Sequence, residues 1–99
     1  MDFFERCYAK ESSIVARKIA DEIILVPVRK NVGDLESIYT LNEVGAKIWE
    51  LIDGKKKIKN IRDEILEEFD ATEEQVNEDL EAFIKKFEEI GGIKLLQKL

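Results

Sequence analysis

Residues 41–61 read LNEVGAKIWELIDGKKKIKNI, a stretch in which one helical pattern stops and another begins. The apolar side chains of its first half recur at helical spacing and form a single stripe, which consists of Val44, Ile48, Leu51 and Ile52 and is broadened by Trp49. This pattern predicts an amphipathic helix that buries one face. A second helix then follows within the same stretch.

Signals for helix ends bracket this first helix. Thr40 and Glu43 have the S/T-x-x-E spacing of a capping box, so we expect the helix to begin at Thr40. Asp53 and Gly54 predict its end, because glycine readily takes the left-handed conformation that closes a helix. Gly45 lies inside the pattern and costs about 1 kcal/mol relative to alanine. We therefore expect a neighbouring element to approach closely there.

Two more helices are expected after the lysines. The first carries apolar residues at helical spacing, namely Ile58, Ile61, Ile65, Leu66 and Phe69. The second covers residues 72–90, begins with a capping-box pattern of Thr72 and Gln75, and stops at Gly91 and Gly92. Residues 93–96 form either a short strand or a tail that returns to the core.

The residues before the stretch favour strands. Residues 14–19 and 23–28 are rich in β-branched and aliphatic side chains, and residues 35–41 alternate between two faces. Together they predict a three-stranded antiparallel meander. The fold class is therefore α+β, an N-terminal three-stranded antiparallel sheet followed by three helices, the outline of a winged helix-turn-helix. We expect one domain over residues 1–99, in which residues 1–12 could be disordered.

Composition excludes several classes of function. The chain has 99 residues, 44% of them hydrophobic and 38% charged, with a net charge of -6, one cysteine (Cys7) and no histidine. An internal disulfide and a Cys/His zinc site are excluded, and the commonest catalytic base is missing. There is no Gly-rich phosphate loop and no G-x-S-x-G motif. We expect a binding module that is not an enzyme and has no cofactor, located in the cytoplasm because no signal peptide or membrane span is evident.

The lysines at positions 55, 56, 57 and 59 raise the alternative of a winged-helix DNA-binding regulator. In a helix-turn-helix the later helix enters the major groove. Here that helix, residues 72–90, carries seven carboxylates against two lysines, so phosphates would repel it. A solvated turn between two helices is the favoured interpretation of the lysine run. DNA binding is kept as the second hypothesis.

Three segments in order resemble the PqqD family, which includes pyrroloquinoline quinone (PQQ) biosynthesis protein D and its relatives. They are LNEVGAKIWELIDG at 41–54, V-x-x-D-L-x-x-F-I at 76–84 and G-G-I-x-L at 91–95, and the likeness covers residues 15–96. Members often have threonine at the position of Lys57, where it would cap the second helix. Lysine cannot accept those amide hydrogen bonds, so Asp53 or water is expected to do so.

The resemblance implies a function as a RiPP recognition element, a domain that captures the leader of a ribosomally made precursor peptide. It implies delivery to a radical-SAM or related maturation enzyme, as in PQQ biosynthesis. The family's peptide site is a cleft between the third strand and the third helix, where the leader is added as an extra strand. Carried over to this chain, the strand side is Leu35, Glu36, Ser37, Ile38 and Tyr39, and the helix side is Val76, Asp79, Leu80, Phe83, Lys86 and Phe87.

Overall fold

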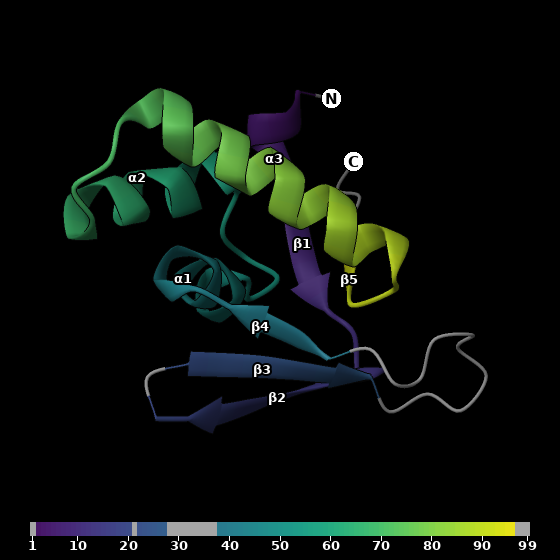
Figure 1. The fold of residues 1–99 in the computed structure, drawn as a ribbon. Coiled ribbons are helices and arrows are strands. Elements are labelled where there is room, and N and C mark those ends of the chain that lie inside the picture. Colours follow the sequence, from purple (N-terminus) through teal and green to yellow (C-terminus); the bar gives the residue numbers. More distant parts are fainter. Residues whose placement is uncertain (1, 21, 28–37, 97–99) are drawn as a thin grey trace.

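The computed structural model describes residues 2–20, 22–27 and 38–96, and the structural statements below concern these residues (Figure 1). Along the chain the elements are a 3-10 helix η1 (Phe3–Glu5), β1 (Cys7–Lys10), β2 (Ile14–Ile19), β3 (Glu22–Pro27), β4 (Tyr39–Leu41), α1 (Glu43–Leu51), α2 (Ile58–Glu68), α3 (Glu73–Glu89) and β5 (Ile93–Leu96). The predicted α+β class, a three-stranded antiparallel sheet followed by three helices, is confirmed.

The three-stranded sheet has the order β2-β3-β4, with both pairs antiparallel. Leu25 of β3 lies opposite Tyr39, and Ile23 lies opposite Leu41. In the part of the sheet that the structure describes, β4 is therefore an edge strand. The strand predicted at 35–41 is observed at Tyr39–Leu41, whereas Leu35, Glu36 and Ser37 lie outside the described residues.

A second sheet joins the two ends of the chain. β1 pairs antiparallel with β5, from Cys7 opposite Leu96 to Lys10 opposite Ile93. This settles the expectation for residues 93–96 in favour of a strand. β1 lies within residues 1–12, the segment for which the sequence allows disorder, and Tyr8 of this strand is buried at 2% exposure. Local pattern could not show this, since the strand's partner lies at the other end of the sequence.

The start of α1 differs from the prediction. Thr40 lies in β4, opposite Ile24, so it cannot cap the helix. Asn42 is the N-cap instead, and its Oδ1 accepts a hydrogen bond of 2.8 Å from the backbone N–H of Gly45. A Cβ at Gly45 would lie 3.2 Å from this oxygen, so the expected close approach is made by the cap residue.

The lysine run forms a turn tied down by carboxylates. Lys57 and Lys59 donate hydrogen bonds of 2.9 Å to Glu5, and these bonds, that from Lys57 foremost, lower the pKa of Glu5. Lys57 is the N-cap of α2 and makes no side-chain cap, whereas Arg6 O accepts from the first helical amide, that of Ile58, at 2.9 Å. The start of α2 is thus held by the backbone of the η1–β1 segment and by Asn60, whose Oδ1 accepts a hydrogen bond of 3.1 Å from the amide of Lys57.

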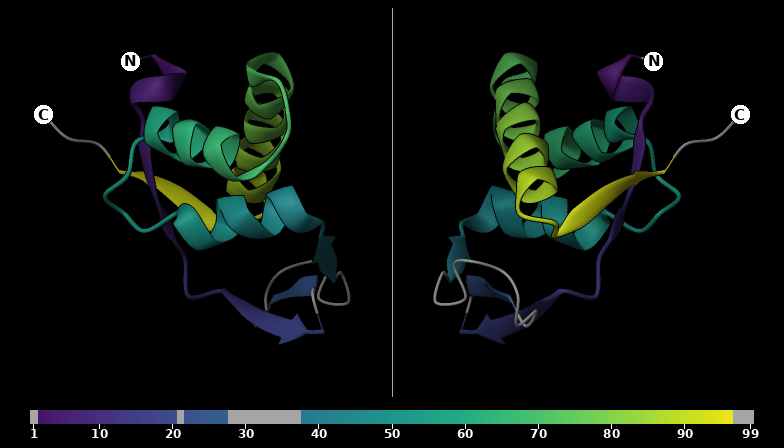
Figure 2. Two further views of the ribbon diagram at one scale, coloured as in Figure 1. Left: turned by 90° about the vertical axis from the view of Figure 1, so that its left-hand side faces the viewer. Right: turned by 90° about the vertical axis from the view of Figure 1, so that its right-hand side faces the viewer.

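α2 and α3 lie on one side of α1, and the three-stranded sheet lies on the other side of α1 (Figure 2). The core runs through all of these layers, and the side chains with 0% exposure are Leu25, Ile58, Ile65, Val76 and Leu80. α3 crosses the top of the molecule (Figure 1), and its apolar side chains belong to the same core cluster as those of α1 and β4. No helix in the described part of the chain has the length and apolar character needed to cross a membrane.

Asp53 makes the stability of this fold sensitive to acid. Its Oδ1 accepts hydrogen bonds of 2.9 Å from the amides of Lys56 and Lys55, which lower the pKa of Asp53 from 3.8 to about 2. Because the folded-state pKa lies below the unfolded one, ionised Asp53 stabilises the fold above pH 4, and this contribution is lost as the pH falls toward 2. We expect Asp53→Asn, which keeps an acceptor oxygen but does not titrate, to be less stable than the parent at pH 6.

The measurement is urea unfolding of both proteins between pH 6 and pH 2. The difference in the free energy of unfolding should shrink as the pH falls through the window from 4 to 2. A difference that stays constant across this window would show that Asp53 is not the titrating group.

Candidate functional site: a cleft between β4, α1 and α3

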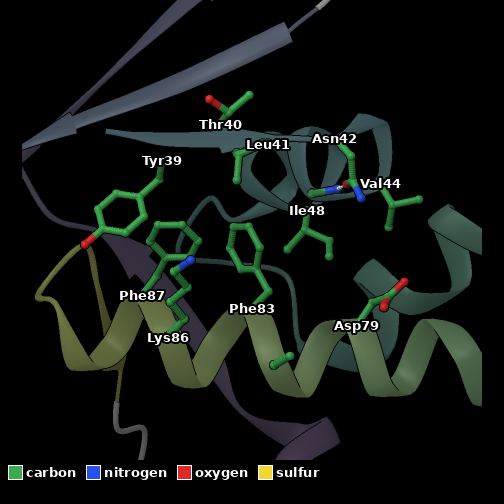
Figure 3. A pocket seen from close by; sticks show the side chains of 12 residues that line it. Tyr39, Thr40, Leu41, Asn42, Val44, Ile48, Asp79, Phe83, Lys86 and Phe87 are labelled. Atoms are coloured by element: carbon green, nitrogen blue, oxygen red, sulfur yellow. Dashed lines mark hydrogen bonds between the residues drawn. The ribbon is translucent and has the colours of Figure 1, made fainter. Parts of the chain in front are cut away.

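A cleft of about 270 Å³ lies where β4, the first half of α1 and one face of α3 meet (Figure 3). Its lining residues are Tyr39, Thr40, Leu41, Asn42, Val44, Gly45, Ile48, Asp79, Ala82, Phe83, Lys86 and Phe87. The strand contributes an open backbone edge and α1 closes the far end. α3 supplies Asp79, Ala82, Phe83, Lys86 and Phe87.

Stacked aromatic rings form an apolar wall of this cleft. The ring centroids of Phe83 and Phe87 lie 4.6 Å apart, and Phe87 meets Tyr39 edge-to-face at 5.6 Å. Behind them Trp49 lies 6.2 Å from Phe87 and ties the wall to α1. Phe83 and Phe87 are 8% and 2% exposed, so both rings belong largely to the core and only a small part of each forms the cleft wall.

Two charged side chains mark the cleft. Lys86 places its Nζ 4.9 Å from the centroid of Tyr39, a cation–π contact. Asp79 lies on the same face of α3, toward the N-terminal end of that helix (Figure 3). Both side chains are exposed, and neither makes an ion pair with any residue that the structure describes.

A second hollow of about 480 Å³ lies between the three-stranded sheet and the outer side of α1 and α2. Its main cation, Lys47, is paired with Glu68 at 3.1 Å and Glu50 at 3.4 Å, and these hydrogen bonds raise the pKa of Lys47. Lys47 is therefore held by two glutamates, while Lys18 and Glu43 also line this hollow. The smaller cleft is the better binding site, since it combines a strand edge that no described strand covers with aromatic side chains and two charges of opposite sign.

The structure brings together five of the residues predicted for the site: Tyr39, Asp79, Phe83, Lys86 and Phe87. Ile38 precedes β4 and is 60% exposed, so it adjoins the strand edge without lining the cleft. Val76 and Leu80 are 0% exposed and belong to the core. The remaining predicted residues, Leu35, Glu36 and Ser37, lie outside the described part of the chain.

Sequence reasoning missed the contribution of α1 and of one small residue on α3. The lining from α1 and its cap is Asn42, Val44, Gly45 and Ile48. Ala82 lies between Asp79 and Lys86 at helical spacing and is exposed, which leaves room in the middle of the cleft. A small residue between two spaced charges on one helix face was the available signal.

Chemically, the cleft suits a binding role. Within the residues that the structure describes, no group of three or more His, Cys, Asp or Glu side chains comes together to hold a metal ion. The cleft offers hydrogen-bonding backbone, aromatic surface and two charges of opposite sign. These are the elements with which proteins bind an extended peptide by strand addition.

Comparison with known proteins agrees with this architecture. Among solved structures, the chain is similar to one described as TbiB1 in complex with the TbiA(beta) leader peptide, with a TM-score of 0.72 and 22% identity. The match covers 91% of this chain and 99% of that one, and at this identity it shows a shared fold. No match was found among curated protein sequences. A family model described as coenzyme PQQ synthesis protein D (PqqD) matches residues 22–93, most of the length, and the chain therefore belongs to the PqqD family.

Proposed function

We propose that this chain binds the leader segment of a ribosomally made precursor peptide, which adds as a strand to the open edge of β4. Alternate side chains of the leader then enter the cleft between β4, α1 and α3. The observation that carries the proposal is that β4 is an edge strand among the described residues and lies beside an aromatic wall and two charges that no described residue pairs. Membership of the PqqD family and the shared fold of TbiB1, whose structure contains a leader peptide, support it.

The energetics of such a site are sufficient for capture. Each added backbone hydrogen bond contributes about 1 kcal/mol net. One apolar leader side chain buried against Phe83 and Phe87 contributes about 1.5–3 kcal/mol. A few backbone bonds with one or two anchors, less the cost of ordering the peptide, correspond to roughly micromolar affinity. Sequence preference has to come from the cleft, because every peptide presents the same backbone.

The partner in this proposal is an enzyme that modifies the captured peptide, a radical-SAM or related maturase, with the present chain as a non-catalytic carrier. The product is a modified peptide or a PQQ-like cofactor. Binding of DNA by α3 is disfavoured, because exposed carboxylates such as Glu74, Glu78 and Glu81 dominate its solvent face. Salt-dependent retardation of duplex DNA at physiological ionic strength would favour that alternative.

The proposal is tested by titrating a synthetic leader segment, taken from a short peptide gene beside the gene for this chain, into the labelled protein. We expect saturable amide shifts at Tyr39–Leu41 and around Ala82 and Lys86. Two N-methylated versions of the peptide, offset by one residue, separate backbone pairing from side-chain binding. One version should lose affinity and the other should retain most of it, because alternate amides of an added strand face β4. Shifts confined to α2, or equal loss with both versions, would exclude strand addition.

A further inference from the structure

The two ends of the cleft carry opposite charges, so a bound peptide would meet a different charge at each end. Lys86 lies beside Tyr39, where β4 begins, and Asp79 lies toward the end of the cleft that Val44 lines (Figure 3). Neither is neutralised by another described side chain, whereas nearby Lys47 is held by two glutamates. Both charges are thus available to a ligand.

The spacing of these charges fits an extended peptide. Lys86 follows Asp79 by seven positions, which puts the two residues on one face of α3 about 10.5 Å apart along its axis. Cleft-facing residues of a strand alternate, and two of them four residues apart are about 13 Å apart. The long stem of Lys86 covers the difference. The cleft-facing residue midway between them then lies over Ala82 and against Phe83, so it should be apolar.

The direction of the peptide follows from the sheet. Both strand pairs of the described three-stranded sheet are antiparallel, and an added strand that continues this pattern runs opposite to β4. β4 runs from the Lys86 end of the cleft toward the Asp79 end (Figure 3). The peptide therefore enters beside Asp79 and leaves beside Lys86.

We propose, on the basis of the function inferred above, that the cleft selects leader segments with the pattern basic-x-apolar-x-acidic from N- to C-terminus. The basic side chain pairs with Asp79, the apolar one lies against Ala82 and Phe83, and the acidic one pairs with Lys86. Opposite charges at fixed positions set the register and reject the reversed arrangement by like-charge repulsion.

Three synthetic peptides test this selection: GSTKTLTETSG, its charge-reversed isomer GSTETLTKTSG and the neutral GSTQTLTQTSG. At low salt we expect the first to bind about tenfold more tightly than the second, with the third between them, since two partly exposed pairs change from attraction to repulsion. The preference should shrink at high salt. The doubly exchanged protein, Asp79→Lys with Lys86→Glu, should prefer the second peptide. Lys85→Glu is the matched control, because Lys85 is an exposed neighbour that does not line the cleft.

The outcomes separate the two proposals. Equal affinity of all three peptides, with amide shifts at the cleft, would overturn the charge selection and leave strand addition intact. A preference that the exchanged protein keeps unchanged would also overturn it. Absence of saturable shifts at the cleft with all three peptides would count against both proposals.

Discussion

Replacing Ala82 by tryptophan is expected to reduce the affinity for a leader peptide about thirtyfold or more while the protein remains folded. Ala82 is exposed on α3 and lines the middle of the cleft, between Asp79 and Lys86. An indole at this position fills the space that the central apolar side chain of the peptide would occupy. Loss of one buried apolar anchor costs about 1.5–3 kcal/mol, and a loss of about 2 kcal/mol is about thirtyfold in the dissociation constant.

The matched control is Glu78→Trp, which places the same residue type on the same helix at an exposed position outside the cleft lining. Alanine is the best helix former, so Ala82→Trp should cost a few tenths of a kcal/mol more in stability than Glu78→Trp, and both variants should remain folded. Binding is measured by fluorescence anisotropy of a labelled leader peptide. If the two variants bind equally well, the peptide does not pass over Ala82 and the cleft is not the site.

Much of the fold could be predicted because its signals are local. Residues 72–90 were expected to form a helix, and α3 spans Glu73–Glu89 with Thr72 as its cap, whose Oγ1 accepts from the Gln75 amide at 3.1 Å. The periodicity and the cap both depend on residues that are close in the sequence, so both can be predicted from the sequence alone. The meander was equally visible, since its alternating strands follow one another along the chain.

What the sequence did not show depends on partners far away in the chain. β1 forms because it pairs with β5, and the sequence of residues 1–12 contains no pattern that predicts this pairing. Thr40 and Asn42 are both of a residue type that can cap α1. Thr40 pairs with Ile24 of β3 and so belongs to β4, which leaves Asn42 as the N-cap. The α2 start is similar, because a carbonyl of Arg6 satisfies an amide that Lys57 cannot.

The helix side of the candidate site is an expectation from the family resemblance, and of its residues Asp79, Phe83, Lys86 and Phe87 line the cleft. Phe83 and Phe87 are also buried in the core, at 8% and 2% exposure, whereas Val76 and Leu80, at 0% exposure, do not reach the cleft at all. Periodicity identifies one broad face of a helix but cannot tell which part of it meets the core and which meets a cleft. That division is set by where α1 and β4 approach α3.

Leu80→Ala tests this division and should destabilise the protein by about 3 kcal/mol while changing the peptide affinity of the folded protein by no more than about twofold. Leu80 is 0% exposed, so truncation leaves a cavity in the core, and such changes cost roughly 2–5 kcal/mol. The loss is measured by urea unfolding, with the volume-conserving Leu80→Met as the control that should cost less than about 1.5 kcal/mol. A domain of this size has about 5–15 kcal/mol of stability, so the alanine variant remains mostly folded and can be titrated with peptide. Since Leu80 does not line the cleft, its truncation should lower the free energy of unfolding without changing peptide binding. If folded Leu80→Ala instead loses affinity as strongly as Ala82→Trp, the peptide must reach beneath the aromatic wall, and Leu80 would then belong to the binding site as the family resemblance implied.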